Sequence, residues 1–293
     1  MFRELINEAK IELTLELNSP LCIRTGGSDL FDPNLPDMQC LKTNINGEKR
    51  YIIPGSTLKG VIRSRYEKII ELFGMRNCDI LDNKSECNNK ESFEKITNEK
   101  GKNIYKKICD TCKFFGCGNM SSRIKFKDLH TIENSEVYTS IRNGVAINRI
   151  TGAAKKGALY EYEVVDEATF KGSIFLNNFE AKQLKLLMFV LRDIDEGYIS
   201  MGSSTSRGNG DMRVKDINFK IKDFNKNDLE KENNNFKLSN IDSFEMKKIN
   251  WIKGNEELYY YYSDFSKENM EMDEFIENRF GLIKLDFEGE SNE

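Results

Sequence analysis

The chain has 293 residues, of which 39% are hydrophobic and 31% charged, so it is long enough to bury a core as one domain with insertions or an appendage. No apolar run approaches the ~18 residues of a membrane span, and residues 1–10 lack the apolar segment of a signal peptide. These features predict a cytoplasmic protein with no membrane partner. In that compartment seven cysteines are better interpreted as metal ligands, buried groups or reactive thiols than as disulfides.

The charge is unevenly distributed along the chain. The net charge of −4 is unusual for a nucleic-acid binder, but residues 222–293 carry 10 Lys and Arg against 18 Asp and Glu, and residues 1–221 carry 34 against 30. Residues 49–76 hold seven bases against two acids. This cluster is either a basic binding surface or, as is commoner, a solvated helix face.

Apolar spacing predicts the elements in chain order. Residues 10–16 alternate as a half-buried strand does, and residues 51–53 form a short extended piece. Ser56 is the expected N-cap of a helix that reaches residue 73. Two strands (124–126 and 170–176), a helix (179–194) and a closing strand (214–221) follow. This order predicts an α+β fold with a ferredoxin-like, RRM-like core.

Three stretches lie outside that core. Residues 74–120 form a polar, cysteine-bracketed insertion that lacks the apolar residues to pack by itself. Residues 138–165 have two apolar arms around a Gly, Ala and Lys stretch, which predicts a long hairpin. Residues 222–293 form an acidic C-terminal appendage, either docked or partly disordered, and residues 1–221 form the main domain.

Two glycine-containing turns are candidate anion sites. The Pro54-Gly55 turn brings Ser56 and the free amides of a helix N-terminus together, with Lys59 and Arg63 one turn apart behind them. A second loop, residues 202–210, precedes the last strand and offers backbone donors with Arg207. It matches neither a Walker loop nor a dinucleotide fingerprint. Both turns suit phosphate.

The cysteines of the insertion have the spacing of a metal site. Cys109 and Cys112 form a Cys-x2-Cys pair suited to tetrahedral zinc, and Cys78 and Cys87 could complete a four-sulfur site. Cys117 is a competing fourth ligand. Bound metal would explain how a polar insertion folds. Free cysteines and a redox pair are the alternatives.

His130 is the sole histidine of the chain, which excludes a nuclease that uses paired histidines as acid and base. Catalysis would have to rest on carboxylates, lysines, arginines or a metal ion.

Four short strings, in this order, resemble the repeated backbone subunit of type III CRISPR effector complexes, a branch of the RAMP superfamily. They are Gly-Gly-Ser-Asp (26–29), Ile-Pro-Gly-Ser-Thr-Leu-Lys-Gly (53–60), Asn-Arg-Ile-Thr-Gly (148–152) and Ser-Arg-Gly-Asn-Gly (206–210). The resemblance spans roughly residues 10–221. It implies a zinc-binding insertion, a hairpin thumb laid across the guide–target duplex, copies stacked head to tail along one guide RNA, and contacts with other CRISPR effector subunits.

The resemblance also implies site residues. Together with the turn chemistry, it predicts that guide RNA contacts Ser56, Lys59, Arg63, Asn148, Arg149, Gly202 and Arg207. Asp37 falls where cleaving members of the family have their catalytic aspartate, but the loop is shorter here and Asp32 competes with it. Cleavage of target RNA by Asp37 with Mg or Mn is the leading hypothesis. A non-catalytic guide-RNA scaffold and, less favoured, a zinc-bearing adaptor that binds protein through its tail are the alternatives.

Overall fold

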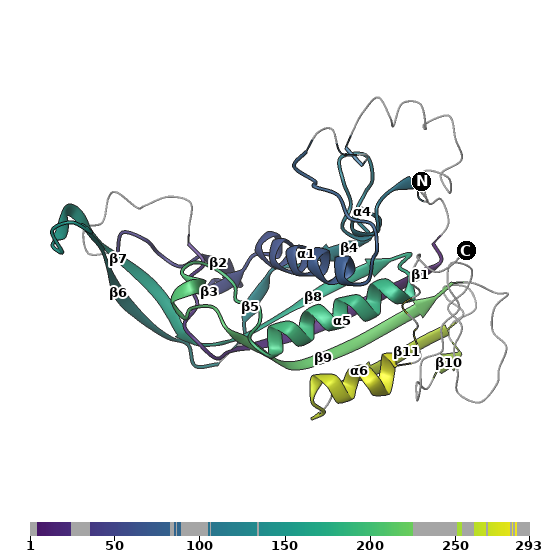
Figure 1. Cartoon of the computed structure of the whole chain (residues 1–293). Coiled ribbons are helices and arrows are strands. Elements are labelled where there is room, and N and C mark those ends of the chain that lie inside the picture. The colour runs from purple at the N-terminus through teal and green to yellow at the C-terminus, as the bar shows by residue number, and fades with distance from the viewer. Residues whose placement is uncertain are drawn as a thin grey trace.

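A computed structural model describes residues 5–24, 36–82, 85, 87–88, 105, 107–133, 135–224, 251–253, 261–267, 269–281, 283 and 285. The fold is mixed α+β, with one large antiparallel sheet, helices on one of its faces and a hairpin that projects from one end (Figure 1). The strand order across the sheet is β10-β11-β9-β1-β8-β5-β3-β2, and β4 also pairs with β8.

The centre of the sheet is β1 (Asn7–Leu17), which lies between two long antiparallel partners. Ile11 pairs with Ile174 on one side and Phe219 on the other, and all three side chains are fully buried. Alternate residues of β1 face the helices, as the period of two in the sequence predicted. The other central strands are β8 (Thr169–Asn177), β9 (Met212–Asp223), β4 (Ile124–Phe126) and β5 (Leu129–Thr131).

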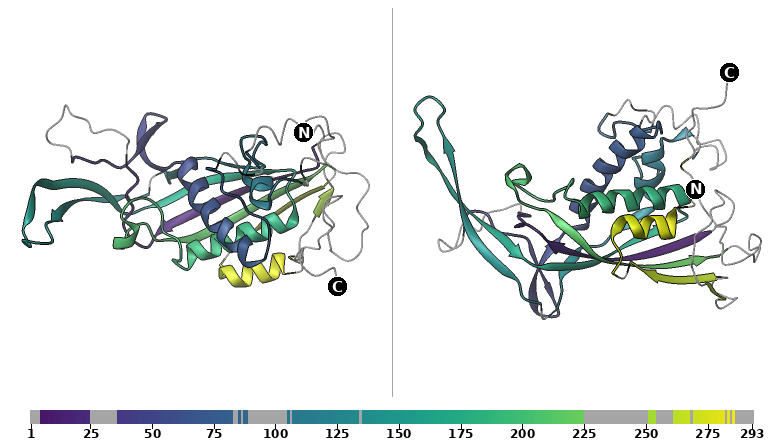
Figure 2. Two further views of the ribbon diagram at one scale, coloured as in Figure 1. Left: turned by 45° about the horizontal axis from the view of Figure 1, so that its top comes forward. Right: turned by 60° about the horizontal axis from the view of Figure 1, so that its bottom comes forward.

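Two long helices, α1 (Gly55–Leu72) and α5 (Ala181–Asp195), cover the same face of the sheet (Figure 2). Their buried residues recur every three or four positions and fill the core, as in the α1 series Leu58, Ile62 and Tyr66. The prediction that Ser56 caps α1 is wrong. Pro54 is the N-cap, and no side chain of the cap residue bonds the helix amides.

A short hairpin leads into α1. Its strands are β2 (Lys42–Ile45) and β3 (Glu48–Ile53). Asn46 and Gly47 turn the chain with φ of 52° and 89°, the left-handed conformations that a type I′ turn requires. The sequence prediction included only residues 51–53 of this hairpin.

The projecting hairpin consists of β6 (Tyr138–Ile147) and β7 (Ala154–Glu167), two residues longer than the predicted range 138–165. Gly144 lies under the ring of Tyr160, where a Cβ would approach the ring to 2.2 Å. The outer half of the hairpin exposes several large apolar side chains: Val145, Ile147, Ile150 and Leu159.

In the insertion, the structure describes a short helix, α4 (Asp110–Phe115), which packs on α1. Phe114 and Phe115 are buried against Tyr66 of α1, with ring centroids 5.5 and 5.1 Å from the tyrosine ring. The insertion is therefore anchored to the main core through these aromatic rings.

The described part of the tail continues the same sheet. It contains β10 (Trp251–Lys253), β11 (Tyr261–Ser266) and α6 (Met272–Phe280), and β11 pairs with β9. Phe265 stacks on Phe219 at 4.8 Å between ring centroids, and Phe275 and Phe280 pack around the same ring. Among the described helices, none is both long and apolar enough to span a membrane.

Candidate functional site

Four cysteines of the insertion converge on one point. The sulfurs of Cys78, Cys87, Cys109 and Cys112 all lie within 4.8 Å of one another, and three of the four residues are buried. Cys78 Sγ lies 3.5 Å from both Cys109 Sγ and Cys112 Sγ. Four thiolates at about 2.3 Å from a tetrahedral zinc stand about 3.8 Å apart, so this donor set fits a metal ion such as zinc.

Backbone amides support the same arrangement. The Cys109 amide donates to Cys87 Sγ, and the Cys112 amide donates to Cys109 Sγ, both at 3.4 Å. Amide hydrogens directed at sulfur stabilise thiolate, the form that binds metal. The Cys-x2-Cys turn is therefore shaped by the first turn of α4.

The remaining cysteines lie outside this group. Cys117 is not among the four mutually close sulfurs, so the geometry favours Cys78 and Cys87 as the partners of Cys109 and Cys112. Cys22 and Cys40 are buried in the main core beside β7.

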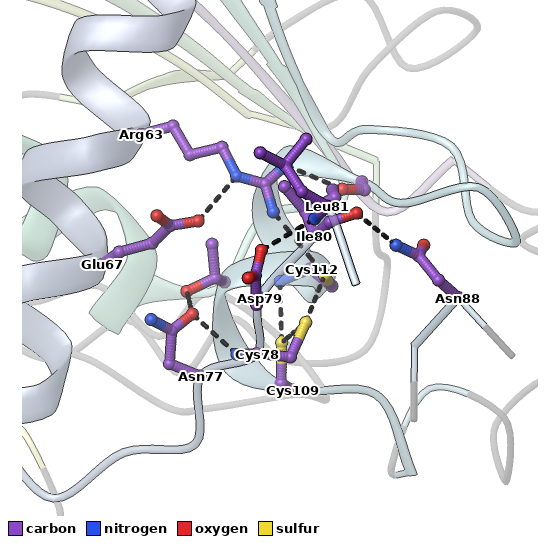
Figure 3. Close-up of polar contacts among 12 residues, drawn as sticks. Arg63, Glu67, Asn77, Cys78, Asp79, Ile80, Leu81, Asn88, Cys109 and Cys112 are labelled. Atoms are coloured by element: carbon purple, nitrogen blue, oxygen red, sulfur yellow. Dashed lines mark hydrogen bonds and ion pairs between the residues drawn. The ribbon is translucent and has the colours of Figure 1, made fainter. Parts of the chain in front are cut away.

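Arg63 of α1 contacts the cysteine cluster rather than solvent (Figure 3). Its guanidinium donates to Glu67 at 2.8 Å, to the Gly116 carbonyl at 3.1 Å and to Cys112 Sγ at 3.8 Å. These contacts use three of the five N–H groups of Arg63 inside the protein, and its contact with RNA stays a prediction. Arg63 also places a positive charge beside the cluster of four cysteine sulfurs.

The N-terminus of α1 is already bonded to a carboxylate. Asp128, which follows β4, accepts the Gly55 amide at 2.8 Å. Sequence reasoning missed this residue, since nothing in the local sequence places it near Pro54. The anion that the free amides were expected to bind is therefore partly replaced by a side chain of the protein itself.

Lys59 lies on the same helix. Its side chain is half-buried, and burial, followed by the nearby charge of Arg63, lowers the pKa of its ammonium group. Within the described part of the chain it has no hydrogen-bond or ion-pair partner. Ser56, on the first turn, is exposed.

The second glycine-rich loop packs against Cys22, in the segment that follows β1. Gly202 has φ of +89°, and a Cβ there would meet the Cys22 carbonyl oxygen at 2.6 Å. The Ser203 amide donates to that same carbonyl at 2.8 Å. Arg207 ends the short 3-10 helix η1 (Thr205–Arg207), and its side chain is exposed.

Asn148 and Arg149 lie at the tip of the hairpin. Asn148 Oδ1 accepts the Ile150 amide at 2.9 Å, so this side chain shapes the turn, while Arg149 is exposed. The tip projects away from α1 (Figure 1). Within one chain, the structure therefore does not bring these two residues together with Lys59.

Asp37 lies beside the middle of the hairpin, where Glu161 pairs with Asn143. It is exposed, and its Oδ2 accepts the Glu161 amide of β7 at 2.9 Å. Its Oδ1 has no partner among the described residues. The competing Asp32 lies outside the residues that the structure describes. A single presented carboxylate with one open oxygen can bind a hard divalent ion or accept a proton.

The fold and these sites define a mixed α+β protein with a four-cysteine cluster, two glycine-rich turns and a projecting hairpin. The sequence model of the RAMP superfamily matches residues 14–213, which is more than half of the chain, so the protein belongs to this superfamily. Membership fits a CRISPR-associated, RNA-binding subunit. A search of curated proteins gave no significant match.

Proposed function

We propose that the protein is a guide-RNA-binding backbone subunit of a type III CRISPR effector complex, built on a ferredoxin-like core. The strand order supports that core. In β9-β1-β8-β4 every neighbouring pair is antiparallel, and the two crossover helices α1 and α5 lie on one face. This is the arrangement that a split β-α-β unit produces.

The proposed guide-RNA surface combines a helix, a glycine-rich loop and the hairpin tip. Lys59 and Arg207 are cations without an internal partner in the described part of the chain, and Ser56 and Gly202 belong to the turns beside them. Such groups suit phosphates, which carry no sequence information. Asn148 and Arg149 would reach RNA held on a neighbouring copy, because the tip extends away from its own core (Figure 2).

The hairpin is the proposed thumb. It pairs with itself as a separate two-stranded sheet, and its outer half exposes apolar side chains such as Ile147 and Ile150. Exposed apolar groups on a rigid arm suit insertion into stacked bases. We propose that the thumb of one copy lies across the guide–target duplex bound by the next copy, head to tail.

Cleavage of target RNA is the proposed activity, and the observation that carries it is the position of Asp37. This exposed carboxylate is fixed to the middle of the projecting hairpin by the Glu161 amide. A target nucleotide displaced there would have its 2′-hydroxyl beside Asp37, which holds or takes its proton. Bound Mg or Mn would neutralise phosphate charge.

The test is cleavage of paired target RNA by the assembled complex with Asp37→Ala. The complex should lose metal-dependent cutting while its affinity for guide and target is nearly unchanged, because a carboxylate repels phosphate in the ground state. The matched control is Asp32→Ala. Loss in the control alone would transfer the role to Asp32, whereas intact cleavage in both variants would favour a non-catalytic scaffold of the same fold.

A further inference from the structure

The segment that carries Asp37 is paired with the edge of β7. The Met38 amide donates to the Glu161 carbonyl at 3.2 Å, and the Glu163 amide donates to the Met38 carbonyl at 2.8 Å. Met38 and Tyr162 form a parallel bridge. The position of Asp37 is thus set by how residues 37–40 lie on the hairpin.

This pairing ends at Glu163. Two residues further on, Val165 pairs with Leu21 in the opposite direction, with both amide–carbonyl bonds at 2.8 and 2.9 Å. The amide of Cys40, two residues after Met38, bonds to the Glu163 side chain instead of a backbone carbonyl. Its N–H donates to Glu163 Oε2 at 2.9 Å.

The other oxygen of the same carboxylate binds two further strands. Glu163 Oε1 accepts from Lys42 Nζ of β2 at 2.9 Å and from the Tyr51 hydroxyl of β3 at 2.5 Å. The residue is only 9% exposed. Burial by itself would raise the pKa of Glu163, but the bonds from Tyr51, Lys42 and the Cys40 amide together lower it.

We propose that Glu163 is a positioning residue for Asp37, because its carboxylate binds residues 40 and 42 and so holds the Asp37 segment against β7 of the hairpin. This inference rests on the proposed role of Asp37 in cleavage. Glu163 is not proposed to touch RNA or a metal ion. It acts through the backbone of residues 37–40.

Glu163→Gln would keep the shape of the side chain but lose one of its two acceptor oxygens. All three partners of Glu163 are used as donors, and two of them, the Cys40 amide and the Lys42 ammonium, cannot accept a hydrogen bond. The NH2 group of the glutamine would therefore face either the Cys40 amide or the Lys42 ammonium, and two donors cannot form a hydrogen bond with each other. Tyr51→Phe is the milder variant, since it removes one donor and keeps the charge pair of Glu163 with Lys42.

The first measurement is backbone hydrogen exchange of the purified chain, which does not depend on RNA cleavage. Glu163→Gln should speed exchange at residues 38–42 by at least about tenfold, and Tyr51→Phe should do so less, since lost charge-assisted bonds allow local opening. Asp166→Asn is the control, because Asp166 lies on the same strand and pairs with Arg142. Unchanged exchange in Glu163→Gln would overturn the inference.

The second measurement is cleavage by the assembled complex at saturating target. Glu163→Gln should slow cutting by about 10- to 100-fold and leave target affinity within about twofold of the original. The reason is that displacing a catalytic group lowers the cleavage rate much more than the binding affinity. Tyr51→Phe should fall between Glu163→Gln and the Asp166→Asn control. Faster exchange with normal cleavage would overturn the positioning role. Normal cleavage by Asp37→Ala would refute the catalytic role itself, and the positioning role would fall with it even where the exchange result stands.

Discussion

Arg63 has contacts inside the protein that residue spacing alone did not indicate. Four residues separate it from Lys59, so both were expected on one RNA-facing stripe of the helix. Because α4 packs on α1, the guanidinium instead points to Cys112 and the Gly116 carbonyl. The residue joins the proposed RNA-binding helix to the cysteine cluster.

Removing Arg63 should therefore weaken metal binding. Four thiolates around a divalent ion carry net negative charge, and loss of an outer-shell partner typically costs about 10- to 100-fold in metal affinity. We predict a loss of this size for zinc in Arg63→Met, measured by competition with a coloured chelator. Arg65→Met is the control, since Arg65 lies on the same helix and pairs with Asp193 at 2.6 Å. Equal zinc affinity in the two variants would contradict the prediction.

The cluster of four cysteines could be predicted from the sequence, but its surroundings could not. A Cys-x2-Cys pair has a spacing fixed by local geometry, so Cys109 and Cys112 stand out in a linear sequence. Glu163 gave no such signal, because its partners Cys40, Lys42 and Tyr51 are more than 100 residues away. Long-range pairing of this kind requires the fold.

At the level of the elements, the start of α1 depends on a distant side chain. Pro54 has no amide hydrogen and its side chain cannot cap, so the Gly55 amide needs an acceptor from elsewhere. Asp128 provides it from the turn after β4. The carboxylate also lies at the positive end of the helix dipole.

Asp128→Ala should cost about 1 kcal/mol of unfolding free energy, within the range of about 0.5–2 kcal/mol for a lost N-cap. Asp128→Asn keeps an acceptor oxygen and should cost less than half of that. Urea denaturation of the metal-loaded chain would compare the two variants. If both lose the same amount, the charge rather than the hydrogen bond is responsible; no loss in either means that Asp128 does not stabilise α1.

Periodic elements were predictable, and of the short strands β4 was predicted at residues 124–126, β3 only in part, and β2 and β5 not at all. The long elements β1, α1, α5 and β9 have apolar patterns of two or 3.6 residues over many positions, and their predicted centres are right. The β2–β3 hairpin had a usable signal in Asn46-Gly47, and α6 had one in Met272, Phe275, Ile276 and Phe280. β5 has three residues and no pattern, so only its pairing with β3 and β8 defines it.

On the scale of the whole molecule, the described strands of the acidic tail are separated from the proposed RNA-binding end. β10 and β11 lie at the end of the sheet away from the β6–β7 hairpin (Figure 1). Residues 222–293 have 18 acids against 10 bases, so a tail placed near the hairpin would repel RNA. Packing of Phe265 on Phe219 holds β11 on the core of the sheet.

If Lys59 and Arg207 contact guide phosphates, they should do so without regard to sequence. Each lost contact should flatten the salt dependence of single-stranded RNA binding by about 0.7 in the log–log slope, because fewer counterions are released. The measurement is binding of two unrelated RNAs by Lys59→Ala and Arg207→Ala over a range of salt concentrations. Lys68→Ala is the control, since Lys68 is an exposed cation on the same helix as Lys59. A loss confined to one RNA sequence, or an equal change in the Lys68 variant, would contradict phosphate contact at these two positions.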